Sequence, residues 1–180
     1  MKIPLTYGAI MAVAAAVLTL LLYFAGLHDN PEKFGTGQLL GVIGGLAVGI
    51  TCLALAIREK RANHPVTSAW GYGSALGGGV LTGLVASVLG IATGYLYFAV
   101  IHPGFGDLVL QVELAKLEGK GVPASAIAQA EGMIKFMTRP GMMIAMQAIV
   151  GFFWTVVLSL IIAIFFRRRA ADTPPLIPAQ

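Results

Sequence analysis

Four glycines, Gly37, Gly41, Gly45 and Gly49, recur at every fourth position of one apolar segment, GQLLGVIGGLAVGITCLALAI. A spacing of four places them all on one face of a helix. Glycine inside a helix costs about 0.5–1 kcal/mol relative to alanine, so a repeated glycine face needs a compensating contact. In a bilayer such a face lets a second helix approach closely, where dispersion and weak Cα–H···O contacts stabilise the pair. The repeat therefore predicts a bundle of packed membrane helices.

The composition agrees with a membrane protein. The 180 residues are 57% hydrophobic and 11% charged, whereas soluble domains carry about 25% charged residues. The net charge is +4, but the basic residues lie at the ends of apolar segments, which is typical of topology signals and not of nucleic-acid binding. The single cysteine, Cys52, lies within an apolar segment and is predicted to be a small core residue.

Four apolar segments are long enough to cross about 30 Å of hydrocarbon at about 1.5 Å per residue. The first could also be a signal peptide, because Lys2 precedes it. Its apolar core exceeds the usual length of about 7–15 residues, so we expect an uncleaved span. The predicted fold is an all-α membrane domain over residues 1–169, followed by a disordered tail at 170–180. The predicted spans cover residues 3–26, 37–57, 68–101 and 141–166.

The third segment would be about 50 Å long if it were helical throughout, which is longer than the hydrocarbon layer. Its first turns carry Trp70 and Tyr72, and its last turns carry Tyr95, Tyr97 and Phe98. Tyrosine and tryptophan are enriched where a membrane meets water. We therefore expect these residues at the two membrane interfaces.

Small residues also recur every four positions in the third segment, at Gly71, Ala75, Gly79, Gly83 and Ser87. Two such faces on consecutive helices can form one close contact. We therefore expect the second and third spans to pack together, with Gly41 and Gly45 close to Gly79 and Gly83.

The segment 105–138 differs from the spans because it carries half of the acidic residues and three lysines. Apolar residues recur at helical spacing on both sides of a turn at Gly119 and Gly121, which predicts an amphipathic helical hairpin at the membrane surface. The hairpin could bind a partner, rest on lipid headgroups or cover the ends of the spans. The residues of the candidate partner surface are Leu108, Val112, Ile127 and Ile134.

The fourth span carries Gln147, Thr155 and Ser159, spaced by multiples of four residues. Such a polar stripe could line a pore or contact a ligand. The alternative, which we favour, is hydrogen bonding between helices, worth about 0.6 kcal/mol per contact.

Basic residues predict the orientation of the chain. Arg58, Lys60 and Arg61 end the second span, and residues 167–169, all arginine, end the fourth. Short loops rich in lysine and arginine face the cytoplasm. Both termini are therefore predicted to be cytoplasmic, with the hairpin on the outer side.

The sequence contains few signals of catalysis or metal binding. No Asp, Glu, Lys or Arg lies in the centre of a predicted span, which argues against proton relays and ion-coupled transport. We expect no catalytic residue and no cofactor. His28 and His102, near Asp29, could hold a metal if the first and third spans were neighbours. The alternative, histidines in interfacial turns without a metal, is the one we favour.

The order of these segments resembles a known family. A Tyr7-Gly8 pair opens the first span, IREKR closes the second, and the third begins SAWGYGSALGGGVLTGLVAS. The hairpin reads LAKLEGKGVPASAIAQAEGMIKF and the last span GFFWTVVLSLIIAIFFRRR. Over residues 5–169 the chain resembles the bacterial family catalogued as domain of unknown function 4199, although its hairpin is less acidic and richer in lysine. The resemblance implies four membrane helices in a bacterial membrane and no assigned activity.

Together these patterns predict a non-enzymatic integral protein of the bacterial inner membrane that acts through helix–helix or surface contacts. It would be an accessory subunit, an assembly factor or a homo-oligomer, with the lipid bilayer and a membrane protein as its partners. The alternative is a small transporter or channel formed by self-association, suggested by the polar stripe of the fourth span.

Overall fold

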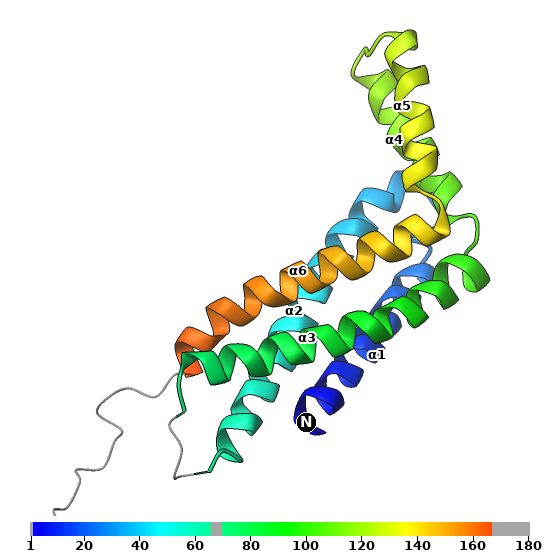
Figure 1. Ribbon diagram of the computed structural model, residues 1–180. Helices are drawn as coiled ribbons and strands as arrows, with labels where there is room; N and C mark the ends of the chain where they lie inside the picture. Colours follow the sequence, from blue (N-terminus) through cyan, green and yellow to red (C-terminus); the bar gives the residue numbers. More distant parts are fainter. Residues whose placement is uncertain (1, 66–69, 167–180) are drawn as a thin grey trace, which may run out of the picture.

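The computed structural model describes residues 2–65 and 70–166, and all the regular structure in this part of the chain is helical (Figure 1). Four of the helical segments are long and apolar enough to cross a membrane, as predicted. The start of the predicted third span at 68–69, the arginine run 167–169 and the tail 170–180 lie outside the described residues. The elements in chain order are α1 (Lys2–Phe24), α2 (Pro31–Ala62), α3 (Tyr72–Tyr95), the π-helix η1 (Leu96–Ile101), α4 (Phe105–Gly119), α5 (Ala124–Met137) and α6 (Pro140–Phe166).

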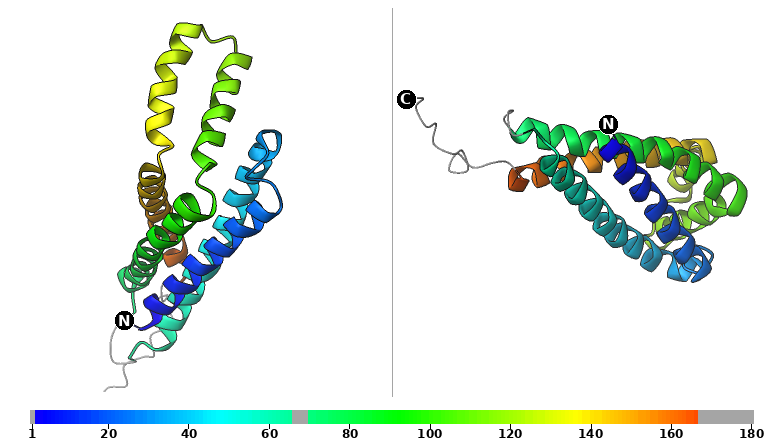
Figure 2. Two further views of the ribbon diagram at one scale, coloured as in Figure 1. Left: turned by 90° about the vertical axis from the view of Figure 1, so that its right-hand side faces the viewer. Right: turned by 90° about the horizontal axis from the view of Figure 1, so that it is seen from below.

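The four long helices lie side by side, and α3 packs most extensively on α6 and on α1 (Figures 1 and 2). Helices α4 and α5 pack against each other and project from one end of the bundle, here called the hairpin end. Helix α1 begins and α6 ends at the opposite end, here called the terminal end.

Helix α2 is longer than the apolar segment that predicted it. It begins at Pro31 because the Asn30 side chain accepts a hydrogen bond from the Glu32 backbone N–H at 2.9 Å, and proline suits the first helical position. It continues through the charged run to Ala62 and ends at Asn63. The predicted span 37–57 is thus the apolar middle of a longer helix.

A core cluster closes the terminal end of the bundle, where α2, α3 and α6 meet. Trp70 is only 3% exposed, and its indole N–H donates to the Phe166 carbonyl at 2.9 Å. This differs from the predicted interfacial ring, because the hydrogen bond lets the indole be buried. The buried members of the cluster are Leu53, Ile57, Trp70, Ala75, Ile162 and Ala163.

The glycines of α3 face α6 and not the glycines of α2. A Cβ atom added to Gly79 would lie 2.8 Å from Cβ of Ser159, and one added to Gly83 would lie 2.6 Å from Cβ of Thr155. The small residues of the third span therefore pack on the polar stripe of the fourth. Helices α2 and α3 do pack on each other, as predicted, but the predicted contact between their glycine faces was wrong.

The glycines in the first part of α2 instead face α1 and the turn that follows it. A Cβ atom on Gly37 would lie 2.7 Å from the Leu27 carbonyl oxygen, and one on Gly41 would lie 3.5 Å from Leu22 Cδ1. A Cβ atom on Gly45 would meet no atom within 4 Å. Leu22 of α1 and Leu27 of the turn after α1 therefore lie against the glycine face of α2 near the hairpin end.

Candidate functional site

A cavity of about 610 Å³ lies among α1, α2, α3, η1 and α6, and it is partly open to the surface of the bundle. Its lining is dominated by apolar side chains and glycine. It lies within the segments that can cross a membrane. The glycines that line it are Gly41, Gly45, Gly49, Gly90, Gly94 and Gly151.

Missing side chains create this cavity. Added Cβ atoms on Gly45, Gly90 and Gly151 would all meet nothing within 4 Å, although these glycines come from three different helices. The glycine repeat of α2 predicted close helix packing, but part of the repeat lines the cavity instead. Gly90 and Gly151 were not predicted as site residues, because an empty space leaves no pattern in the sequence.

The cavity occupies the half of the bundle nearer the hairpin end. Its lining extends over about 12–14 Å along α1, from Met11 to Leu20, and along α2, from Gly41 to Gly49. It is longer on the other two walls, about 16 Å along residues 147–158 of α6 and about 22 Å along residues 86–101 of α3 and η1. On α1 and α2 this length is close to the thickness of one leaflet, half of the hydrocarbon core of about 30 Å, and on α3 and η1 the lining extends further towards the hairpin end. Towards the terminal end α2 meets α6, since Leu158 Cδ1 would lie 3.4 Å from a Cβ atom on Gly49. The core cluster lies beyond this contact.

Three threonine hydroxyls in the cavity wall are engaged within their own helices. Thr19 donates to the Ala15 carbonyl at 3.0 Å, Thr93 to the Gly90 carbonyl at 3.2 Å and Thr155 to the Phe152 carbonyl at 2.8 Å. These bonds satisfy the hydroxyl hydrogens without a ligand.

Two other polar side chains of the wall, Ser87 and Gln147, form no hydrogen bond with any residue that the structure describes. The Gln147 carboxamide lies over the α3 backbone, where its Oε1 would be 3.4 Å from a Cβ atom on Gly94. A primary amide has two donor hydrogens and an accepting oxygen. The cavity thus contains unused hydrogen-bonding capacity.

The predicted polar stripe of α6 divides between two environments. Gln147 and Thr155 line the cavity, whereas Ser159 is fully buried against Gly79 and donates to the Thr155 carbonyl at 2.6 Å. The hydroxyls of Thr155 and Ser159 are thus bonded within α6, not between helices as we favoured.

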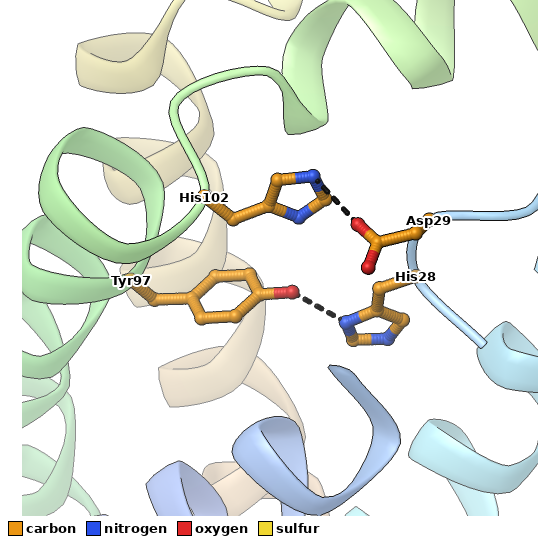
Figure 3. Close-up of polar contacts among 4 residues, drawn as sticks. All are labelled: His28, Asp29, Tyr97 and His102. Atoms are coloured by element: carbon orange, nitrogen blue, oxygen red, sulfur yellow. Dashed lines mark hydrogen bonds and ion pairs between the residues drawn. The ribbon is translucent and has the colours of Figure 1, made fainter. Parts of the chain in front are cut away.

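A polar cluster lies beside the cavity at the hairpin end (Figure 3). Tyr97 also lines the cavity, and its hydroxyl lies 2.5 Å from Nδ1 of His28 in the turn between α1 and α2. His102 Nε2 lies 3.0 Å from the Asp29 carboxylate. The structure thus brings together the two histidines that the sequence places far apart, since the ends of α1 and α3 are neighbours.

Aromatic rings surround this polar cluster. The His102 ring packs at 5.0 Å from Tyr23 and 5.5 Å from Phe105. Burial, and next the neighbouring His102, lower the pKa of His28 below its usual value. His28 is therefore neutral at pH 7, and its Nδ1 can accept the Tyr97 hydroxyl hydrogen. The two histidines have different partners, and the described residues include no group of three or more His, Cys, Asp or Glu placed to hold a metal ion.

The candidate partner surface of the hairpin is largely covered within the chain. Val112 is 8% exposed, and Leu108, Ile127 and Ile134 are half-buried. Helices α4 and α5 pack against each other and make fewer contacts with α2 and α6, so the two helices of the hairpin mainly cover each other. The large apolar side chains that α5 leaves exposed are Met133, Phe136 and Met137.

These features define the chain as a helical membrane-protein bundle with an apolar cavity between its long helices. A model of the family described as "Protein of unknown function (DUF4199)" matches residues 6–168. The chain therefore belongs to this family, and the resemblance seen in the sequence is confirmed. No curated protein and no solved structure matches the chain.

Proposed function

We propose that this protein is a non-enzymatic integral membrane protein that binds the apolar chain of a lipophilic molecule in its cavity. The cavity itself carries the proposal. Its volume of about 610 Å³ falls within the range of about 300–1,000 Å³ that is typical of small-molecule sites. A space of this size lined by glycine and apolar side chains has no use in packing, because empty volume removes dispersion contacts.

The dimensions of the cavity favour a single chain over a partner helix. A transmembrane helix is about 10 Å wide and crosses both leaflets. The contact between Gly49 and Leu158 and the core cluster occupy the terminal half of the bundle. One chain from the leaflet at the hairpin end fits the remaining half. Because the terminal half of the bundle is packed, the cavity does not cross the whole bundle. This argues against a transport pathway through one copy of the protein, and a channel would need self-association.

The positions of the basic residues support a multi-pass arrangement in the bacterial inner membrane with both termini in the cytoplasm. Arg58, Lys60 and Arg61 lie at the terminal end of α2. In this orientation the cavity takes its ligand from the outer leaflet, and the hairpin extends from the outer surface.

A second proposal within the same class is contact with a membrane-protein partner or a second copy through the hairpin, as in an accessory subunit or assembly factor. The observation that favours it is the exposed group Met133, Phe136 and Met137 on α5. Methionine-rich apolar surfaces adapt readily to partners.

The cavity proposal is tested by photocrosslinking in phosphatidylcholine vesicles. The probe is a long-chain alcohol with a diazirine in its chain, and the crosslinked residues are mapped by mass spectrometry. We expect crosslinks concentrated on the cavity walls of α2, α3 and α6. The double variant Gly45→Leu, Gly151→Leu fills the cavity from two walls and should lose these crosslinks.

Gly77→Leu is the matched control. An added Cβ atom on Gly77 also meets nothing within 4 Å, but this residue does not line the cavity. It should leave the crosslinking pattern unchanged. Crosslinks spread evenly over the lipid-facing residues, with no enrichment in the cavity and no effect of the double variant, would contradict the proposal.

A further inference from the structure

We infer that the cavity selects an uncharged amphiphile, a long apolar chain that carries a hydroxyl or carbonyl group, and that Gln147 recognises this group. The inference rests on the proposed function, since it assigns the chemical class of the molecule bound. Its basis is the combination of an apolar cavity, an exposed amide in its wall that no described residue bonds, and the lack of charged groups among the described residues of that wall.

The position of Gln147 gives the first step. It is the eighth residue of α6, which places it about 10 Å along the helix from its start at the hairpin end. A carboxamide at this depth in a membrane segment costs free energy unless its hydrogen bonds are made. None of the described residues bonds to it. A ligand in the cavity can supply the missing partner.

The second step is the charge of the cavity wall. The described residues that line it include no Asp, Glu, Lys, Arg or His. An ionised group without a partner is costly at this depth. A phosphate, carboxylate or ammonium group would therefore stay outside, whereas a hydroxyl or carbonyl group could reach Gln147.

The third step is hydrogen-bond complementarity. The Gln147 amide both donates and accepts, and so does the unpartnered Ser87 hydroxyl. A ligand hydroxyl group can accept a hydrogen bond from the amide N–H and donate one to the amide oxygen, and a ligand carbonyl group can accept from the amide N–H. A site with unpaired polar groups discriminates against a ligand that lacks the matching group. A phospholipid chain that enters with its headgroup outside would gain nothing from Gln147.

The test uses the full chain in phosphatidylcholine vesicles and four diazirine probes of one chain length: an alcohol, a methyl ketone, an alkane and an ionised fatty acid. We expect the alcohol and the ketone to crosslink within the cavity about five- to tenfold more than the alkane, as one net hydrogen bond implies. The fatty acid should be captured no better than the alkane. The crosslinks of an alcohol with its diazirine beside the hydroxyl should map near Gln147 and Gly94.

Gln147→Leu should reduce capture of the alcohol to the level of the alkane. Gln147→Met serves as a second, unbranched variant if the leucine variant is misfolded. Gln38→Leu is the matched control, because Gln38 lies on α2 outside the cavity wall, and it should leave the preference intact.

The outcomes separate this inference from the proposed function. Equal capture of alcohol and alkane in the cavity, or a preference that survives both variants of Gln147, would overturn the inference and leave chain binding intact. Better capture of the fatty acid than of the alcohol would also overturn it. Absence of cavity crosslinks with every probe would overturn both proposals.

Discussion

The contact between α3 and α6 at Gly83 offers a sharp test of the packing. A Cβ atom on Gly83 would lie 2.6 Å from Cβ of Thr155, whereas carbon atoms in contact are ordinarily about 3.5–4.0 Å apart. Gly83→Ala must therefore separate the two helices locally by about 1 Å. Cβ of Thr155 is fixed to the α6 backbone and cannot move aside by rotation.

The expected magnitude is a balance of two effects. Overpacking a close contact costs about 1–3 kcal/mol, while replacing a helical glycine by alanine gains about 0.5–1 kcal/mol. We expect Gly83→Ala to lower the free energy of unfolding by about 0.5–2 kcal/mol, with a fall in Tm of about 1–8 °C for a chain of this size. Gly45→Ala, facing open space, should raise Tm by about 1–4 °C.

The assay uses the only cysteine of the chain. Cys52 is 7% exposed, so a thiol-reactive fluorescent dye labels it in detergent only when the bundle opens on heating. In the double variant Gly83→Ala, Thr155→Gly, the side chain at the contact is removed from α6 and a methyl group is added on α3, so the steric clash is relieved. The double-mutant cycle should give a favourable coupling of about 1 kcal/mol or more. Equal Tm changes for Gly83→Ala and Gly45→Ala, or strictly additive effects in the cycle, would refute the reasoning.

Three further predictions concern the ends of the bundle. Burial lowers the pKa of His28, where Tyr97, His102 and Asp29 face it, so its contribution to stability is complete above the unfolded value of about 6.5 and is lost as pH falls towards the folded pKa. Thermal unfolding followed by circular dichroism should show Tm falling below pH 6.5, less so in His28→Gln; parallel pH profiles would contradict this. In a chain lacking Cys52, an impermeant thiol reagent on intact cells should label Glu118→Cys and spare Asp172→Cys, and the reverse pattern would disprove the orientation. Replacing the exposed Met133 and Phe136 by Asp should abolish co-purification of a hairpin partner, while Val112→Asp, at a buried position, should unfold the hairpin; a partner retained by the first variant excludes that surface.

The sequence alone predicted the elements and their approximate ends. Apolar length sets the number of helices that can cross a membrane. The predicted second span began at residue 37, whereas Asn30 and Pro31 start α2 earlier in the chain. Helical spacing of apolar residues on either side of Gly121, which has a φ of 71°, indicated α4 and α5. These features are local, because hydropathy, capping and turn geometry depend on residues close together in the chain.

The pairing of the helices was decided only in the tertiary structure. A glycine face has no side chain that specifies what will lie against it, so the spacing of Gly79 and Gly83 could not distinguish α2 from α6. The cavity follows from how four helices splay around Gly45 and Gly151, which no single helix encodes. The contact between His28 and Tyr97 joins residues 69 positions apart, and it exists because α3 packs along α1. Local physical chemistry determined the helices, whereas their mutual packing determined the site.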